Sequence, residues 1–181
     1  MYQSYTVRHI FMAISISILF IGPILLLLIP SFVANSVHNT TGSWLVIVPG
    51  VSYLIYGIGL VLLFLAALFP FLLNISKSSI LISIVCVILS GVTFTLAAKP
   101  FTSLATDSIS FQTHIHTEKH TYGWDEIEST VYNQIPIEEG YSDYVFYFSD
   151  GNQIKITENG LILPLKNQIY KRLEMEGIKV E

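Results

Sequence analysis

Three long apolar segments dominate the first half of the chain. They run from Ile10 to Ala34, from Trp44 to Leu73 and from Ile80 to Ala98. About 20 helical residues cross a hydrocarbon layer roughly 30 Å thick, so each segment is long enough to span a membrane. A segment surrounded by lipid must satisfy its own backbone hydrogen bonds, which a helix does. The pattern therefore predicts a three-helix transmembrane region over residues 1–99.

The second segment is longer than a span requires. Pro49 and Gly50 indicate a bend or an interfacial first turn, and a tilted helix from about Val51 to Leu73 is sufficient. Trp44 stands where an interfacial aromatic anchor is expected.

The first segment has a second interpretation, as a secretory signal peptide, because it follows a short tail with Arg8. Its apolar run is longer than the roughly 7 to 15 residues of a signal peptide's apolar region. The best cleavage position, after Ala34, also has the bulky Phe32 third from the cut. A retained helix is the favoured interpretation.

Beyond residue 99 the continuous apolar runs give way to alternation, which is typical of strands with one buried face. Along residues 109–116, apolar side chains such as Ile109 and Phe111 fall on one face, and polar side chains including His114 and His116 fall on the other. This pattern predicts a strand that is packed on one side and wet on the other.

A hairpin is the clearest turn signal in this half of the chain. The aromatic and β-branched run Tyr144 to Ser149 is followed by Asp150-Gly151 and then by the alternating "NQIKIT". Because Gly accepts the positive φ that a tight turn requires, the pattern predicts two paired strands. Upstream of this hairpin, "ESTVYNQI" predicts another strand and "PIEEGYS" an exposed loop.

The end of the chain has the periodicity of a helix. Pro164 fits a first turn, Leu165, Ile169 and Leu173 form an apolar stripe, and Gly177 fits the position after the last turn. A C-terminal helix is predicted over about residues 164–176. The expected fold class is therefore a membrane all-α helical segment of three transmembrane helices, followed over residues 100–181 by a small, mainly antiparallel β domain with a C-terminal helix.

This order of elements, together with "YGWDEI" at residues 122–127, resembles the bacterial pleckstrin-homology-like (PH-like) domains that are fused to transmembrane helices. The resemblance covers about residues 101–180 and depends on the turn with Trp124, Asp125 and Ile127, the Asp150-Gly151 hairpin and the closing amphipathic helix. It implies a partly open barrel that is capped by a helix and usually faces the cytoplasm, and it supplies no catalytic residues to assign to this chain. Relatives that bind phosphoinositides use a basic cluster in an early hairpin, whereas the hairpin "HTEKH" contains only Lys119 and disfavours headgroup binding.

Charge separates the two halves of the chain. All 13 acidic residues lie after residue 106, and the part before it has only Arg8, Lys77 and Lys99 as basic residues. The C-terminal part has six basic against 13 acidic residues. We expect no nucleic-acid partner, because binding to phosphate backbones depends on Lys and Arg. The three basic residues near the helix ends divide two against one, so they do not decide the orientation of the helices.

The predicted spans contain Ser, Thr and Tyr but no Asp, Glu, Lys, Arg or His. Ion-coupled transporters place such charged groups inside the membrane, so close helix packing or self-association is the favoured role of the polar residues. The single cysteine, Cys86, lies within an apolar run and predicts neither a disulfide nor a thiol-based metal site.

Three of the five histidines, His114, His116 and His120, lie within seven positions. On a strand the first two point to the same side, and the third could return across a turn to chelate a zinc or copper ion. The simpler interpretation is that the first two form the wet face of an edge strand. A histidine-based metal site is kept as an alternative.

These patterns together predict a multi-pass protein of the cell membrane that acts as a membrane-anchored interaction or assembly module, and the resemblance implies that its C-terminal domain lies in the cytoplasm. The expected partners are the lipid bilayer and other membrane proteins or further copies of the chain. The sequence has no phosphate-binding glycine loop and no triad order, so we expect no enzyme activity and no cofactor. Two alternatives stay open: a small channel or transporter subunit, and an extracytoplasmic sensor that uses the histidines as a metal site.

Overall fold

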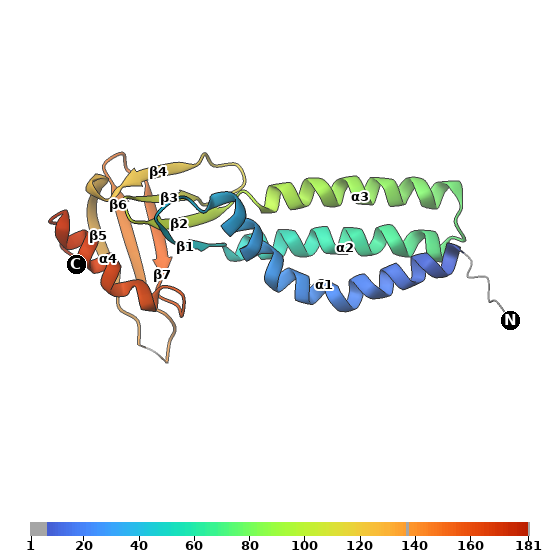
Figure 1. Cartoon of the computed structure of the whole chain (residues 1–181), viewed down its shortest axis with the longest axis horizontal. Coiled ribbons are helices and arrows are strands. Elements are labelled where there is room, and N and C mark those ends of the chain that lie inside the picture. The colour runs from blue at the N-terminus through green and yellow to red at the C-terminus, as the bar shows by residue number, and fades with distance from the viewer. Residues whose placement is uncertain (1–6, 137, 181) are drawn as a thin grey trace. The chain divides into compact units, whose positions relative to one another are not determined.

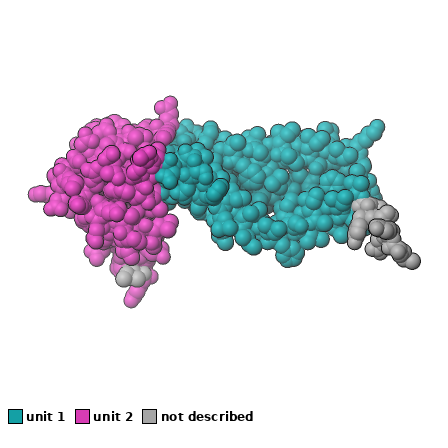
Figure 2. Space-filling view, in the orientation of Figure 1, with its two compact units in different colours: residues 1–39, 46–102, 112–117 teal, residues 40–45, 103–111, 118–181 magenta. Residues whose placement is uncertain are grey.

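The computed structural model describes residues 7–136 and 138–180 (Figure 1). It contains three long apolar helices, two antiparallel sheets and a C-terminal helix, which confirms the predicted fold class. The chain forms two compact units, coloured teal and magenta in Figure 2. Of the described residues, 7–39, 46–102 and 112–117 belong to the helical unit, and 40–45, 103–111, 118–136 and 138–180 belong to the β-rich unit.

The helical unit consists of α1 (Val7–His38), α2 (Gly50–Leu72) and α3 (Lys77–Ala97). All three are long and apolar enough to cross a membrane, as expected of a membrane protein. α2 contacts both other helices and lies between them in Figure 1. Pro23 and Pro30 lie inside α1, where each lacks the N–H that the helix would use, and α1 curves in Figure 1.

Polar side chains of the helices bond across the helix interfaces. Ser90 Oγ donates to the carbonyl of Gly59 at 2.8 Å and joins α3 to α2, and the hydroxyls of Ser31 and Tyr53 lie 3.0 Å apart between α1 and α2. Gly59 also leaves room for the ring of Phe94, because a Cβ atom there would lie 2.5 Å from Cε1 of that ring. These contacts are the close packing that the small and polar residues of the spans predict.

The strands form a four-stranded sheet in the order β1-β2-β3-β4 and a three-stranded sheet in the order β5-β6-β7. The first sheet contains β1 (Ser43–Ile47), β2 (Phe101–Ala105), β3 (Ser108–Gln112) and β4 (His120–Gly123). The second contains β5 (Ile127–Asn133), β6 (Asp143–Phe148) and β7 (Gln153–Thr157). A 3-10 turn, η1 (Trp124–Glu126), connects β4 to β5, and a second, η2 (Leu163–Leu165), leads into α4 (Lys166–Met175).

The structure differs from the sequence prediction at the start of the second apolar segment. Residues Ser43–Ile47, assigned in part to the span Trp44 to Leu73, form strand β1 beside β2, and the helix begins only at Gly50. An aromatic and β-branched strand runs here into an apolar helix with no polar residue between them, so composition alone does not separate the two. The helix start itself agrees with the boundary predicted from Pro49 and Gly50.

Trp44 therefore belongs to the β-rich unit rather than to an apolar helix. Its indole ring lies 5.7 Å from that of Trp124, and its Nε1 donates to Thr106 Oγ1 at 3.1 Å. Trp124 is only 2% exposed, and its own Nε1 donates to the carbonyl of Ala105 at 3.0 Å. The two tryptophans thus connect β1, β2 and η1.

A second difference concerns the strand predicted over residues 109–116. β3 ends at Gln112, and residues 114–117 form a turn. In this turn Thr117 Oγ1 donates to the carbonyl of His114 at 2.9 Å and accepts from the His114 N–H at 3.0 Å. Such side-chain bonds to the local backbone compete with strand pairing, which explains the early end of the strand.

The predicted hairpin and C-terminal helix are both present. β6 and β7 pair antiparallel around a turn in which Gly151 has φ +85°. The helix predicted over residues 164–176 begins as η2 and continues as α4, and Gly177 follows with φ +73°. Ile169 and Leu173 are fully buried, so the apolar stripe of α4 closes the core of this unit.

Candidate binding cleft

An open cleft of about 820 Å³ lies within the β-rich unit. The loop after β5, described for residues 134–136 and 138–142, borders one side, and the chain from the end of β7 to the start of α4 borders the other. Three side chains from different elements form its floor, and three from the loop form its rim: Tyr132, Glu158 and Lys166 in the floor, and Glu138, Glu139 and Tyr141 in the rim.

An ion pair between a buried carboxylate and a partly exposed lysine lies in the floor. The side chain of Glu158 is 6% exposed, and its Oε1 lies 2.9 Å from Lys166 Nζ. The hydroxyl of Tyr132 donates to Glu158 Oε2 at 2.5 Å, and Lys166 Nζ donates to that hydroxyl oxygen at 3.4 Å. Both carboxylate oxygens therefore have a polar partner, which is the condition for keeping a charge inside a protein.

These contacts shift the pKa values of both charged groups. Burial raises the pKa of Glu158, but the hydrogen bonds from Tyr132 and Lys166 and the charge of Lys166 outweigh burial and hold it below its ordinary 4.5. The hydrogen bond to Glu158 raises the pKa of Lys166 above its ordinary 10.5, against the opposing effect of desolvation.

The two shifts define the pH range in which the pair stabilises the fold. A carboxyl group with a lowered pKa stabilises the native state above its unfolded pKa, and this is lost as the pH falls through the folded value. An amine with a raised pKa stabilises it below its unfolded pKa, and this is lost as the pH rises through the folded value. The pair therefore stabilises the unit fully between about pH 4.5 and pH 10.5.

Aromatic rings surround the ammonium group of Lys166. Its Nζ lies 4.8 Å from the ring centroid of Tyr132 and 5.9 Å from that of Tyr170. Behind them, the fully buried ring of Tyr144 lies 4.8 Å from Tyr132, and burial strongly raises the pKa of the Tyr144 hydroxyl, which stays neutral. One carboxylate and the rings of Tyr132 and Tyr170 thus lie around one cation, which is the combination known from cation–π sites.

The rim loop is fixed at its base and open at its tip. Ser142 Oγ accepts a hydrogen bond from the N–H of Ile135 at 3.1 Å, and the N–H of Glu158 donates to the carbonyl of Ser142 at 2.8 Å. At the tip, Gly140 has φ +144° and Tyr141 is 64% exposed. The loop therefore presents its charged and aromatic side chains to water while its ends stay anchored beside the sheet.

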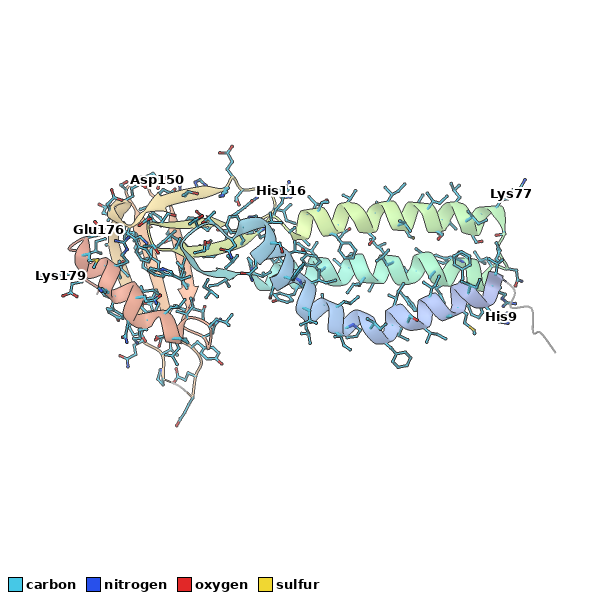
Figure 3. All side chains as sticks on the ribbon, viewed as in Figure 1. His9, Lys77, His116, Asp150, Glu176 and Lys179 are labelled. Atoms are coloured by element: carbon cyan, nitrogen blue, oxygen red, sulfur yellow. The ribbon has the colours of Figure 1, made fainter. Side chains whose placement is uncertain are left out.

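A second polar cluster stabilises the β6–β7 turn. Tyr122 donates to Asp150 Oδ2 at 2.6 Å, and Asn152 Nδ2 donates to the same oxygen at 2.8 Å and to the Tyr122 hydroxyl at 2.7 Å. The bond from Tyr122, together with those from Asn152, lowers the pKa of Asp150, which lies at the surface (Figure 3). Since each polar group has a partner within the cluster, its role is to hold the hairpin in shape.

The structure places two of the three predicted metal ligands in a turn and the third in a strand. His114 and His116 lie exposed in the turn after β3, whereas His120 is the first residue of β4. The ring of His120 stacks on Tyr122 at 6.0 Å, and its Nδ1 lies 3.3 Å from the Tyr122 hydroxyl. Within residues 7–136 and 138–180 there is no group of three or more His, Cys, Asp or Glu arranged to hold a metal ion. The metal site stays a prediction from the spacing of the histidines.

Sequence reasoning did not single out the floor of the cleft. Tyr132 lies 26 positions before Glu158 and 34 before Lys166, and the pairing of β5, β6 and β7 and the docking of α4 bring the three together. The sequence did predict the exposed loop "PIEEGYS", but a loop pattern does not reveal what lies beneath it. An acidic residue directly after a half-buried strand was the one available signal.

No family model matches this chain, and neither a curated protein nor a solved structure matches it. The fold and the cleft therefore define the class of the protein: a membrane protein with three apolar helices and a β-rich unit that contains an open polar cleft.

Proposed function

We propose that this chain is a multi-pass protein of the cell membrane whose β-rich unit captures a partner protein, as a membrane-anchored interaction or assembly module. We place this unit on the cytoplasmic side and regard it as PH-like. The three apolar helices support the anchor, and the two antiparallel sheets closed by α4 support the PH-like fold. The cleft beside the rim loop is the observation that carries the proposal.

The cleft has the size and composition of a recognition site. Its volume of about 820 Å³ lies within the range of about 300 to 1,000 Å³ that is usual for binding pockets. Tyr141 and Leu163 line it and are 64% and 59% exposed, so two large apolar side chains face water beside charged groups. A partner that covers these side chains removes apolar surface from water, which favours association.

Site-specific photo-crosslinking in the native membrane tests this function. A photoreactive phenylalanine analogue replaces Tyr141 at the rim or, as a matched control, Tyr147 on β6, which is 37% exposed and lies outside the cleft. We expect a discrete protein adduct from position 141 and none from position 147. Adducts of equal yield at both positions, or none at position 141, would contradict capture in the cleft.

Deletion of residues 101–181 gives a second test of the same proposal. We expect the shortened chain to insert into the membrane, because the three apolar helices stay intact, and to lose its chemically crosslinked partners. Recovery of the same partners with the shortened chain would place the interaction in the helices.

The side of the membrane is tested by cysteine labelling. Ser149 is exposed and differs from Cys by one atom, so Ser149→Cys in a Cys86→Ser background introduces one accessible thiol. We expect a membrane-impermeant maleimide to label it only after the cells are permeabilised. Labelling of intact cells would place the β-rich unit outside and contradict the cytoplasmic assignment.

A further inference from the structure

The rim of the cleft carries charge that the fold does not neutralise. Glu138 and Glu139 are exposed, and within the described residues neither makes an ion pair. Glu158 in the floor is already paired with Lys166. The lining of the cleft thus has three carboxylates against one ammonium group, which attracts a cation and repels an anion.

The ion pair in the floor shows how the cleft holds a cation. Lys166 Nζ contacts one carboxylate oxygen at 2.9 Å and lies over the ring of Tyr132 at 4.8 Å. The rim offers the same two groups without such a cation, namely the carboxylates of Glu138 and Glu139 beside the exposed ring of Tyr141. The rim therefore offers the groups that bind a second ammonium or guanidinium cation.

Apolar surface distinguishes a polypeptide from a small polycation as the ligand. Tyr141 and Leu163 are more than half exposed, and both line the cleft. A polyamine would satisfy the carboxylates but leave most of this apolar surface wet. A chain that carries a basic residue next to a large apolar one covers both at once.

We infer that the cleft binds a polypeptide segment in which Lys or Arg stands beside a large apolar side chain. The inference rests on the proposed function and specifies the chemistry of the partner. The cation of the segment lies between the rim carboxylates, and its apolar side chain covers Tyr141 and Leu163.

Peptide binding to the full-length chain tests the inference. The protein is held in nanodiscs of phosphatidylcholine, a zwitterionic lipid that does not attract basic peptides by net charge. Three fluorescein-labelled peptides, flanked by Gly and Ser, have the central sequences Leu-Lys-Arg-Leu, Leu-Glu-Glu-Leu and Gly-Lys-Arg-Gly. We expect fluorescence anisotropy to show the tightest binding for the first, weaker binding for the third and none for the acidic second.

Two double variants separate the rim from the general acidity of the unit. Glu138→Gln with Glu139→Gln removes the rim charge, and Glu128→Gln with Glu174→Gln removes the same charge from exposed positions elsewhere. We expect the rim variant to raise the Kd of the first peptide about three- to tenfold, as two exposed charge contacts allow, and the control variant to leave it unchanged. Tryptophan fluorescence verifies that both variants keep their fold.

Several results would overturn the inference. These are equal binding of the basic and acidic peptides, no binding of the first peptide, an equal loss of affinity in both double variants, and displacement of the peptide by spermine at matched charge. Photo-crosslinking at Tyr141 separates this failure from that of the proposed function. If a partner is crosslinked but the basic peptide does not bind, the inference fails alone; if no partner is crosslinked, the proposed function fails.

Discussion

Strand β1 precedes two membrane helices in the chain, yet its Trp44 packs within the β-rich unit, and Trp44→Ala tests this assignment directly. Truncating a buried Trp costs about 3 to 5 kcal/mol of stability. Trp44 is only partly buried, and its hydrogen bond to Thr106 is exposed, so we expect a smaller loss, of about 2 to 3 kcal/mol. For a unit of this size, that loss lowers the melting temperature by roughly 10 to 20 °C.

Tryptophan fluorescence reports on this unit alone, because the chain has two tryptophans, Trp44 and Trp124, and both belong to it. In Trp44→Ala the remaining signal comes from Trp124, which is 2% exposed in the intact fold. We expect thermal unfolding of the full chain in detergent to begin at a lower temperature and the emission of Trp124 to shift to longer wavelength. Trp44→Phe serves as the control, since it keeps an aromatic ring against Trp124 and is expected to recover most of the stability.

Two outcomes would refute the reasoning. A melting temperature of Trp44→Ala equal to that of the unchanged protein would mean that β1 contributes nothing to the unit. An equal loss of stability in Trp44→Phe and Trp44→Ala would mean that ring packing on Trp124 is not the cause.

Three further predictions concern the floor of the cleft, the packing of the helices and the contribution of β1 to the β-rich unit. Lys166→Met leaves Glu158 buried without its cation, and because Lys166 is 36% exposed we expect a loss of folding stability of about 1 to 2 kcal/mol at pH 7. The loss should shrink when thermal unfolding is measured near pH 4, where Glu158 begins to be protonated. Adding Glu158→Gln to Lys166→Met should recover part of the lost stability. Gly59→Val forces the ring of Phe94 to move and should lower the temperature at which the helical circular dichroism is lost. Gly91→Val should not, because a Cβ atom added at Gly91 meets no atom within 4 Å. A fragment of residues 100–181 should show exposed, long-wavelength Trp124 emission, and joining residues 40–47 to its start through a Gly-Ser linker should restore burial.

The apolar helices could be predicted because a span is defined by its length and composition alone. The third predicted segment, Ile80 to Ala98, and the observed α3, Lys77–Ala97, differ only at their ends. α3 begins earlier because Ser76 Oγ accepts a hydrogen bond from the N–H of Ser79 and caps the helix. Local chemistry therefore accounts for the difference.

The cleft could not be predicted because it depends on strand register. Tyr132 pairs with Tyr144, and Tyr144 pairs with Ile156. Glu158 stands two positions beyond Ile156, so strand alternation brings its carboxylate to the side of the sheet where Tyr132 lies. A shift of one residue in either pairing would send Glu158 to the opposite face. The sequence pattern predicts where the strands lie but not which residues of neighbouring strands are paired.

The place of β1 in the chain links the formation of the cleft to membrane insertion. β1 stands between α1, which ends at His38, and α2, which begins at Gly50, so the segment that completes the first sheet is flanked on both sides by apolar helices. A chain whose helices have not inserted carries these helices as exposed apolar segments on either side of β1, and such segments collapse or aggregate instead of leaving the strand free to pair. We therefore expect the β-rich unit to reach its full stability only after insertion, so that partner binding in the cleft occurs at the membrane and not on newly made chains elsewhere. Comparing Trp124 emission in chains translated with and without nanodiscs measures this coupling, and equal burial of Trp124 in both would show that the unit folds independently of insertion.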